Sequence, residues 1–168
     1  MAEQLEHHQH NFKQRQFPIT LVCDGVSSAA NTGSLFRIAD AFGVEEIIFC
    51  VYPPAFSRRM EKTARSAHLR VTNRFEPETS VVLKALKDEG YRLIALEITN
   101  TSTPLKELKI PEHQKTALII GGENHGIAPE HLALADQHIH IEMFGINSSM
   151  NVAMATGICL YEMTRLLK

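Results

Sequence analysis

The sequence contains no tryptophan, and only 7% of its 168 residues are aromatic. It also has only three cysteines, Cys23, Cys50 and Cys159, which are far apart, form no CxxC pair and lie in apolar segments. This pattern excludes a disulfide framework or a cysteine zinc site and is typical of small buried residues in a reducing compartment. No apolar run approaches the length of a membrane span, and the N-terminus lacks the apolar core of a signal peptide. We therefore predict a soluble, cytoplasmic protein with no membrane partner and no metal site.

Excess charge of either sign is also missing, because 17 lysines and arginines are set against 19 aspartates and glutamates, for a net charge of −2. The chain as a whole therefore does not attract polyanions, and a nucleic acid would have to be held by a local patch. A chain of this length fits one domain with a substantial core. Residues 1–16 are polar and contain three histidines, and we expect a flexible N-terminal leader there rather than a metal-binding tract. Residues 17–168 are predicted to form the single domain.

From residue 17 onward, apolar segments with strand character alternate with segments of helical spacing. Strands are predicted at 19–23, 46–51, 91–98, 115–122 and 139–143, and helices at 35–42, 77–89 and from about 152 to 168. Strands that are apolar almost throughout are typical of a sheet covered on both faces. The sequence therefore predicts an α/β fold, a mostly parallel sheet with helices on both faces, and ligand binding beyond the carboxyl ends of the strands.

Three polar loops follow predicted strands. The first, residues 24–33, leads into a helix in which Asn31 suits an N-cap and Arg37 is either solvated or an inward-pointing cation. The second, residues 121–130, has three glycines around Glu123, more than a simple turn needs. The third, residues 145–155, puts Ser149 and Asn151 at a helix start, which fits a plain N-cap or a ligand site. Together the loops predict a ligand site, and the absence of GxGxxG and GxxxxGK[ST] excludes the common dinucleotide and phosphate loops.

A basic segment, residues 57–74, follows the second predicted strand and contains six of the 17 lysines and arginines: Arg58, Arg59, Lys62, Arg65, Arg70 and Arg74. It is either a solvated helix face or a phosphate-binding patch, and the weak overall charge favours the patch. No aromatic motif of the kind that binds single-stranded RNA accompanies it, so we expect recognition through backbone and shape.

The three loops resemble the motifs of a known family. Residues 31–43 (NTGSLFRIADAFG), 119–127 (IIGGENHGI) and 141–153 (IEMFGINSSMNVA) are similar, in this order, to the three motifs of the SpoU/TrmH branch of the SPOUT RNA methyltransferases. The resemblance extends from about residue 18 to the C-terminus. Two residues depart from the family pattern: Gly122 stands where asparagine is frequent, and Glu142 stands where proline is common.

The resemblance implies S-adenosylmethionine (SAM) as cofactor, a ribose 2′-hydroxyl of RNA as methyl acceptor, a homodimer and a C-terminal trefoil knot. It also implies that many relatives carry an RNA-binding domain before the catalytic one, which we do not expect here. The implied catalytic residues are Arg37, Asn31, Glu123, Ser149 and Asn151; the implied cofactor-binding residues are Leu96, Gly121, Ile141 and Met150; Arg58, Arg59, Lys62 and Arg65 are predicted to bind RNA. Because a guanidinium keeps its proton, we expect Arg37 to stabilise an alkoxide rather than act as a base, with Glu123 holding Arg37 or the motif loops.

Two other functions stay open at this point: a SPOUT methyltransferase that acts on a base, and a non-catalytic RNA-binding protein of the same fold. A nucleotide-binding oxidoreductase is disfavoured because no dinucleotide motif is present. Among RNA substrates we favour tRNA over ribosomal RNA, because a compact dimer can grip a folded stem-loop unaided.

Overall fold

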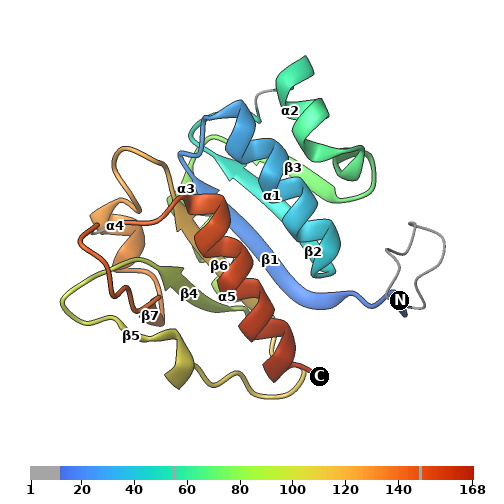
Figure 1. Ribbon diagram of the computed structural model, residues 1–168. Helices are drawn as coiled ribbons and strands as arrows, with labels where there is room; N and C mark the ends of the chain where they lie inside the picture. Colours follow the sequence, from blue (N-terminus) through green and yellow to red (C-terminus); the bar gives the residue numbers. More distant parts are fainter. Residues whose placement is uncertain (1–11, 55, 148) are drawn as a thin grey trace, which may run out of the picture.

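A computed structural model describes residues 12–54, 56–147 and 149–168 (Figure 1). In chain order the elements are β1 (Phe17–Asp24), α1 (Ala29–Ala41), β2 (Val44–Cys50), α2 (Arg58–Ala64), η1 (Ala67–Leu69), β3 (Thr72–Glu76), α3 (Thr79–Asp88), β4 (Arg92–Leu96), β5 (Thr103–Pro104), η2 (Leu105–Glu107), β6 (Thr116–Gly121), α4 (Pro129–Leu132), β7 (Gln137–His140) and α5 (Val152–Leu166). Most of the predicted leader, residues 1–11, lies outside the described residues. Nearer the domain, the Arg15 side chain donates a hydrogen bond of 2.9 Å to the carbonyl of Leu167.

The strands form one sheet in the order β3-β2-β1-β6-β4-β7-β5, and every neighbouring pair is parallel. The register sets Asp24, the last residue of β1, level with Cys50 of β2 and with Gly121 of β6. The loops that follow these three strands therefore leave the sheet at the same edge, which is where ligands bind in such folds.

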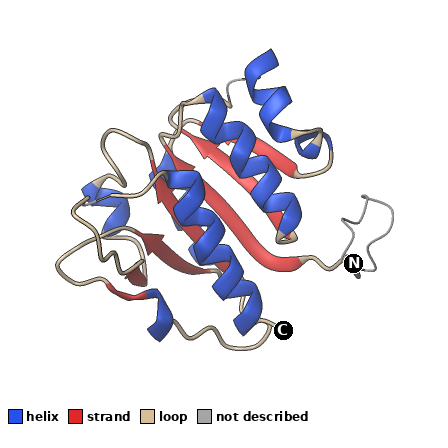
Figure 2. Cartoon of the chain, in the orientation of Figure 1, coloured by secondary structure: helices blue, strands red, loops and turns tan. Residues whose placement is uncertain are grey.

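Helices cover both faces of the sheet (Figures 1 and 2). β1 illustrates the reason: Leu21 packs into the core beneath α1, α2 and α5, while its neighbour Val22 packs into the second core beneath α3. Both side chains are fully buried, as expected for a strand with apolar residues on both sides. The predicted α/β fold with a parallel sheet and helices on both faces is confirmed.

The three cysteines are buried, as the sequence predicts. Burial is also the main reason that the pKa of Cys50 is raised to about 11, so this thiol stays protonated at neutral pH. None of the helices in the described part of the chain combines the length and the apolar character that a bilayer span requires.

Three of the differences from the sequence prediction have a clear physical reason. β3 went unnoticed inside the basic segment because it is an edge strand whose residues are mostly exposed and polar. The last strand is Gln137–His140 rather than 139–143, because β5, its outer neighbour, already ends at Pro104 opposite His140. The N-cap of α1 is Ser28, whose hydroxyl accepts from the backbone N–H of Asn31, so the prediction that Asn31 caps this helix was wrong.

Candidate active site

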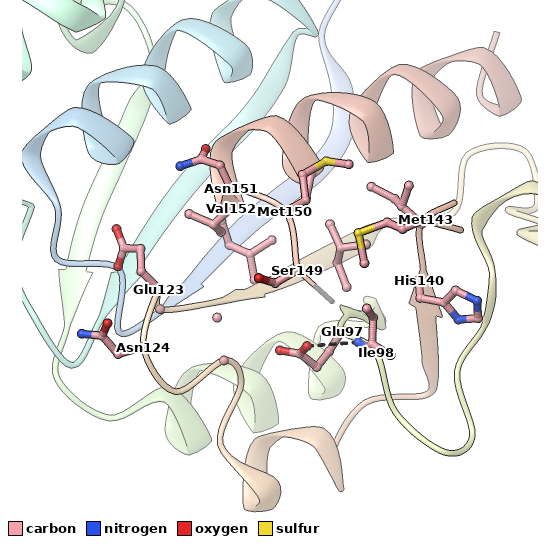
Figure 3. A pocket seen from close by; sticks show the side chains of 17 residues that line it. Glu97, Ile98, Glu123, Asn124, His140, Met143, Ser149, Met150, Asn151 and Val152 are labelled. Atoms are coloured by element: carbon pink, nitrogen blue, oxygen red, sulfur yellow. Dashed lines mark hydrogen bonds between the residues drawn. The ribbon is translucent and has the colours of Figure 1, made fainter. Parts of the chain in front are cut away.

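A pocket of about 630 Å³ opens at the carboxyl edge of the sheet (Figure 3). Its size falls in the range of sites for small ligands and cofactors. Four stretches of chain line it, namely the ends of β4, β6 and β7 with the residues after them, and the start of α5 with the residues before it: Leu96, Glu97, Ile98; Ile120, Gly121, Gly122, Glu123, Asn124, Gly126; His140, Ile141, Met143; and Ser149, Met150, Asn151, Val152, Ala155. The pocket thus brings together the four predicted cofactor-binding residues, Leu96, Gly121, Ile141 and Met150.

The glycines of the second loop allow the backbone to fold back on itself. A Cβ atom on Gly121 would lie 2.1 Å from the carbonyl carbon of Gly126 and 2.4 Å from the nitrogen of Ile127. Gly126 has a φ of +64° and donates its N–H to the carbonyl of Gly122 at 3.0 Å. A side chain at position 121 would push this loop off the end of β6, so the glycine there is needed for the shape of the pocket wall.

Three of the predicted catalytic side chains form a hydrogen-bonded chain across the three loops. The Nδ2 of Asn31 donates to Oε1 of Glu123 at 2.6 Å, and the Nδ2 of Asn151 donates to Oδ1 of Asn31 at 3.0 Å. The Oδ1 of Asn151 in turn accepts from the backbone N–H groups of Ala153 and Met154, at the start of α5. We call Glu123, Asn31 and Asn151 the polar bridge. Asn151 is therefore both the N-cap of α5 and part of the pocket lining.

Arg37 lies apart from this bridge. It is exposed on α1, six residues beyond Asn31, which corresponds to about 9 Å along the helix axis. Within the described part of the chain its guanidinium has no hydrogen bond or ion pair, and it does not line the pocket. Of the two tasks expected for Glu123, the structure supports holding the motif loops through Asn31 and not holding Arg37.

The remaining predicted catalytic residue, Ser149, lines the pocket beside Asn151 and is exposed. Figure 3 shows Asn151 and Met150 on one side of the pocket and Glu97 on the other. Glu97 is not among the residues predicted from the sequence. Its two carboxylate oxygens accept from the N–H groups of Ile98 at 3.0 Å and Ile127 at 3.3 Å, which ties the end of β4 to the glycine loop.

The charge of the pocket is one-sided. Its lining residues include the carboxylates of Glu97 and Glu123 but no lysine and no arginine. A ligand with a positive charge is therefore favoured in this pocket over a neutral or anionic one of the same shape. The described residues contain no group of three side chains placed to hold a metal ion.

A second polar cluster, which was not predicted from the sequence, is centred on Asp24 at the end of β1. The buried carboxylate of Asp24 accepts from the Thr79 hydroxyl at 2.8 Å and from the Ala128 N–H at 3.1 Å. The Nδ1 of His131 lies 2.7 Å from the same carboxylate oxygen that accepts from Ala128. Asp24 thereby joins the end of β1 to the loop after β6.

The predicted RNA-binding residues lie on and just after α2, which packs on the first turns of α1. The contact is close: a Cβ atom on Gly33 would lie 2.6 Å from the carbonyl oxygen of Met60. The exposed side chains of Arg58, Arg59, Lys62 and Arg65, here called the basic helix face, have no ion-pair partner among the described residues.

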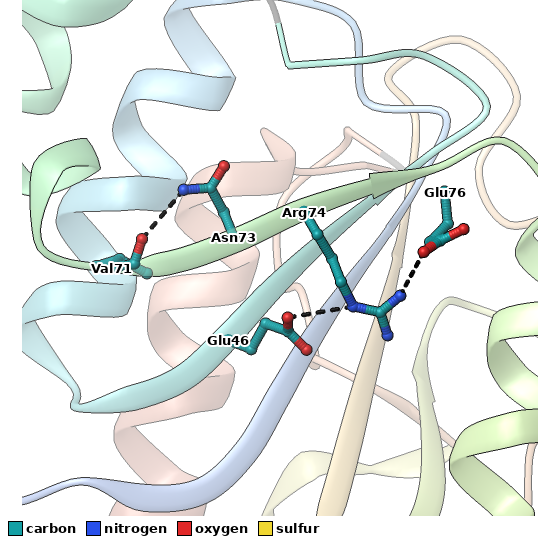
Figure 4. A network of polar contacts seen from close by, with 5 residues as sticks. All are labelled: Glu46, Val71, Asn73, Arg74 and Glu76. Atoms are coloured by element: carbon teal, nitrogen blue, oxygen red, sulfur yellow. Dashed lines mark hydrogen bonds and ion pairs between the residues drawn. The ribbon is translucent and has the colours of Figure 1, made fainter.

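The other two arginines of the basic segment are neutralised within the protein. Arg70 pairs with Asp40 at 2.8 Å, and Arg74 lies between Glu46 and Glu76, at 3.2 and 2.8 Å (Figure 4). The interpretation of the whole segment as one phosphate-binding patch was therefore too broad, because the unpaired charges are confined to the basic helix face.

Comparisons with known proteins identify the family. The SpoU rRNA Methylase family matches residues 18–161. The tRNA (guanosine(18)-2′-O)-methyltransferase of Escherichia coli (strain K12) is 31% identical over 152 residues, which are 90% of this chain and 65% of that protein. The chain thus spans just under two thirds of the length of this relative.

Solved structures are similar over most of the chain. The A. aeolicus TrmH/SpoU tRNA modifying enzyme superimposes with a TM-score of 0.82 and 28% identity, over 90% of this chain and 76% of that one. A structure described as giving insight into the 2-OH methylation of C/U34 on tRNA superimposes with a TM-score of 0.77 and 26% identity, over 89% of this chain and 95% of that one. With the family match over most of its length and the three motif loops joined around one pocket, the chain belongs to the SpoU rRNA methylase family.

Proposed function

We propose that this protein is a SAM-dependent methyltransferase that transfers a methyl group to a ribose 2′-hydroxyl of tRNA. The observation that carries the proposal is the polar bridge, which joins the three motif loops at the rim of a cofactor-sized pocket. Relatives and structural neighbours named for tRNA 2′-O-methylation support the choice of acceptor and favour tRNA over ribosomal RNA.

The pocket fits SAM in size and charge. SAM supplies an electrophilic methyl group on a positively charged sulfonium, and the pocket lining has two carboxylates and no cationic side chain. Leu96, Gly121, Ile141 and Met150 would hold the cofactor, largely through backbone groups and apolar contact. The close approach of the Gly121 and Gly126 backbones supports this, because it leaves main-chain atoms rather than side chains on that wall.

The catalytic work left to the protein is alignment and charge stabilisation. A methyl transfer needs the acceptor oxygen in line with the methyl carbon and sulfur, and such positioning contributes up to about 7–11 kcal/mol in ideal systems. Asn31, Asn151 and Ser149 offer amide and hydroxyl groups that orient a ribose. The guanidinium of Arg37 has no partner among the described residues, so its charge is available to a developing alkoxide or a neighbouring phosphate.

We also propose a homodimer. The exposed face of α5 carries Met154, Ile158 and Tyr161, which are spaced by four and three residues and are 63%, 42% and 64% exposed. Phe144 and Ile146, in the loop before α5, are almost completely exposed. An apolar surface of this kind is typical of a face that a second copy covers.

The remaining expectations belong to the same proposal. A C-terminal trefoil knot is proposed because the three motif loops resemble those of the SpoU/TrmH branch of the SPOUT RNA methyltransferases, which implies it. Residues 17–168 form the proposed single catalytic domain after a leader of residues 1–16. A cytoplasmic location follows from tRNA as substrate.

The experiment is methyl transfer from labelled SAM to unmodified tRNA and to ribosomal RNA, followed by digestion to nucleosides. The wild type should yield a 2′-O-methylnucleoside from tRNA. Arg37→Ala should abolish it, and Arg37→Lys should retain a little activity. Lys84→Ala, which removes an exposed charge from α3, is the matched control and should match wild type.

Three results would contradict parts of this proposal. A methylated base would indicate a base-directed enzyme. SAM binding without transfer to either RNA would indicate a different acceptor or a missing partner protein. Absence of SAM binding in calorimetry would favour a non-catalytic RNA-binding role.

A further inference from the structure

The loop between β2 and α2 exposes two aromatic side chains in a chain that has few of them. Tyr52 is 52% exposed and Phe56 is 57% exposed. Aromatic rings bury large apolar areas and usually lie in cores, so two exposed rings in one short loop indicate a binding surface.

The backbone before Tyr52 is strained. Val51 has a φ of +68°, which is rare for a β-branched residue, and the N–H of Tyr52 donates to the carbonyl of Cys50 at 2.8 Å. This bond across one residue with a positive φ is the strained form of the γ-turn. Backbone strain of this kind persists where the surrounding structure enforces it, and it concentrates at binding sites.

The ring of Phe56 packs against a buried ring. Its centroid lies 6.4 Å from that of Phe36, a fully buried residue of α1, and the two rings are tilted by 37°. Phe56 therefore rests against the core, while more than half of its surface stays accessible. A ring held in this way loses little conformational freedom when a flat ligand stacks on it.

Unpaired positive charge follows directly after these rings. Ser57 caps α2, and the basic helix face begins at the next residue, Arg58. The exposed apolar face of α5 has no comparable unpaired charge on the same helix, because Arg165 of α5 is paired with Glu162. RNA supplies both kinds of group that the β2–α2 region accommodates, flat aromatic bases and phosphates, whereas α5 suits an apolar protein face.

The loop also lies near the pocket. Cys50 at the end of β2, Asp24 at the end of β1 and Gly121 at the end of β6 are level in the sheet register. Tyr52 is two residues beyond Cys50. Because β2 and β6 are two strand spacings apart, Cys50 lies about 10 Å from Gly121 across the sheet. Neighbouring nucleotides of one RNA strand can therefore occupy the pocket rim and this loop together.

We propose that Tyr52 and Phe56, here called the aromatic platform, stack on an unpaired base of the RNA substrate while the basic helix face holds adjacent phosphates. The inference rests on RNA being the substrate, as proposed above. It replaces the expectation that recognition uses backbone and shape alone, and it predicts a preference for RNA with an accessible unpaired base over a fully paired helix.

The absence of tryptophan makes a direct test possible. Tyr52→Trp gives a protein whose only tryptophan lies at the platform, and Val81→Trp gives a control on α3, where the side chain is 63% exposed. Unmodified tRNA and a single-stranded oligonucleotide should quench the tryptophan emission of the Tyr52→Trp variant, while inorganic polyphosphate, which has charges but no bases, should not. Emission from the control should not change with any of the three.

A second measurement separates stacking from charge. Tyr52→Leu and Phe56→Leu should each weaken tRNA binding by about 5- to 150-fold without changing its dependence on salt, whereas Tyr52→Phe should bind as wild type. Arg58→Ala should instead lower the slope of log affinity against log salt by about 1. Thermal unfolding and SAM binding, measured for each variant, establish that the fold and the cofactor site are intact.

Unquenched emission from the Tyr52→Trp variant at saturating tRNA, or wild-type affinity in both leucine variants, would overturn the platform while the wild type still binds and methylates RNA. If the wild type itself bound no RNA in a filter assay, the platform and the proposed function would both be wrong. The two failures are therefore distinguishable.

Discussion

The change Asn31→Asp tests the polar bridge at its centre. Asn31 donates to Glu123 at 2.6 Å and accepts from Asn151 at 3.0 Å. Aspartate has nearly the same shape and can still accept from Asn151, but it replaces the donating nitrogen with an oxygen. The variant therefore sets two carboxylates against each other without altering the packing.

The size of the effect follows from the distance. Two unit charges about 3 Å apart repel by ~1.4 kcal/mol in bulk water and by ~5.5 kcal/mol at an effective dielectric constant of 20. Because the Asn31–Glu123 contact is exposed, we expect a value nearer the lower figure. The pair can avoid this repulsion by binding a proton, which raises a pKa of the pair in the folded state above the ordinary carboxyl value of about 4.

The sign of the pH dependence is then fixed. A carboxyl pair with a raised folded pKa binds more protons in the folded than in the unfolded state, so stability falls as pH rises from about 4 through the raised value. Urea unfolding at pH 4.5 and pH 8 should show Asn31→Asp near wild type at the lower pH and destabilised at the higher. Asn31→Ala, which only loses two hydrogen bonds, should differ from wild type equally at both. If Asn31→Asp lost the same amount of stability at both pH values, the bridge as described would be refuted.

Two further predictions concern the glycine loop at the pocket and a carboxylate at the amino end of β7. Gly121→Ala, whose Cβ would meet the Gly126 and Ile127 backbones, should cost about 1–3 kcal/mol in thermal unfolding and abolish SAM binding in calorimetry, whereas Gly145→Ala, which meets nothing within 4 Å, should do neither. Burial raises the pKa of Asp136, but Lys87 and the Leu93 N–H outweigh it and hold this pKa below its ordinary value. The stabilisation from Asp136 is therefore present above pH 4 and lost as pH falls through the lowered pKa. Asp136→Asn should destabilise by about 1 kcal/mol at pH 7 and much less near pH 3, and an equal loss at both would contradict this.

Much of the fold could be predicted because the central strands are apolar on both faces. β1 and β6 form the middle of the sheet, and all but one of the residues in β1 and all of those in β6 are buried, so both stand out from the neighbouring sequence. β3 and β5 did not stand out. β3 is a polar edge strand, and β5 is two residues long, and neither carries a pattern that separates it from a loop.

The site was predictable where its chemistry is local. The motif loops could be found because Asn31, Glu123 and Asn151 lie in short, unusual stretches of sequence. Their partners could not be inferred in the same way, since the Asn31–Glu123 bond joins residues 92 apart and the Asp24–Ala128 bond joins residues 104 apart. Glu97 and Tyr52 were overlooked for a similar reason: a single glutamate or tyrosine after a strand gains meaning only from what the fold brings next to it.

The polar bridge also bears on when, during folding, the site of the protein is completed. Asn31 lies in the first helix, Glu123 follows the central strand β6, and Asn151 caps α5, so the bridge needs contacts between residues up to 120 apart. Contacts at such separation form late, because the chain must first lose the entropy of closing a long loop. Neither the bridge nor the complete pocket can therefore form before α5 has docked. A folding intermediate in which α5 is not yet docked therefore has no complete site.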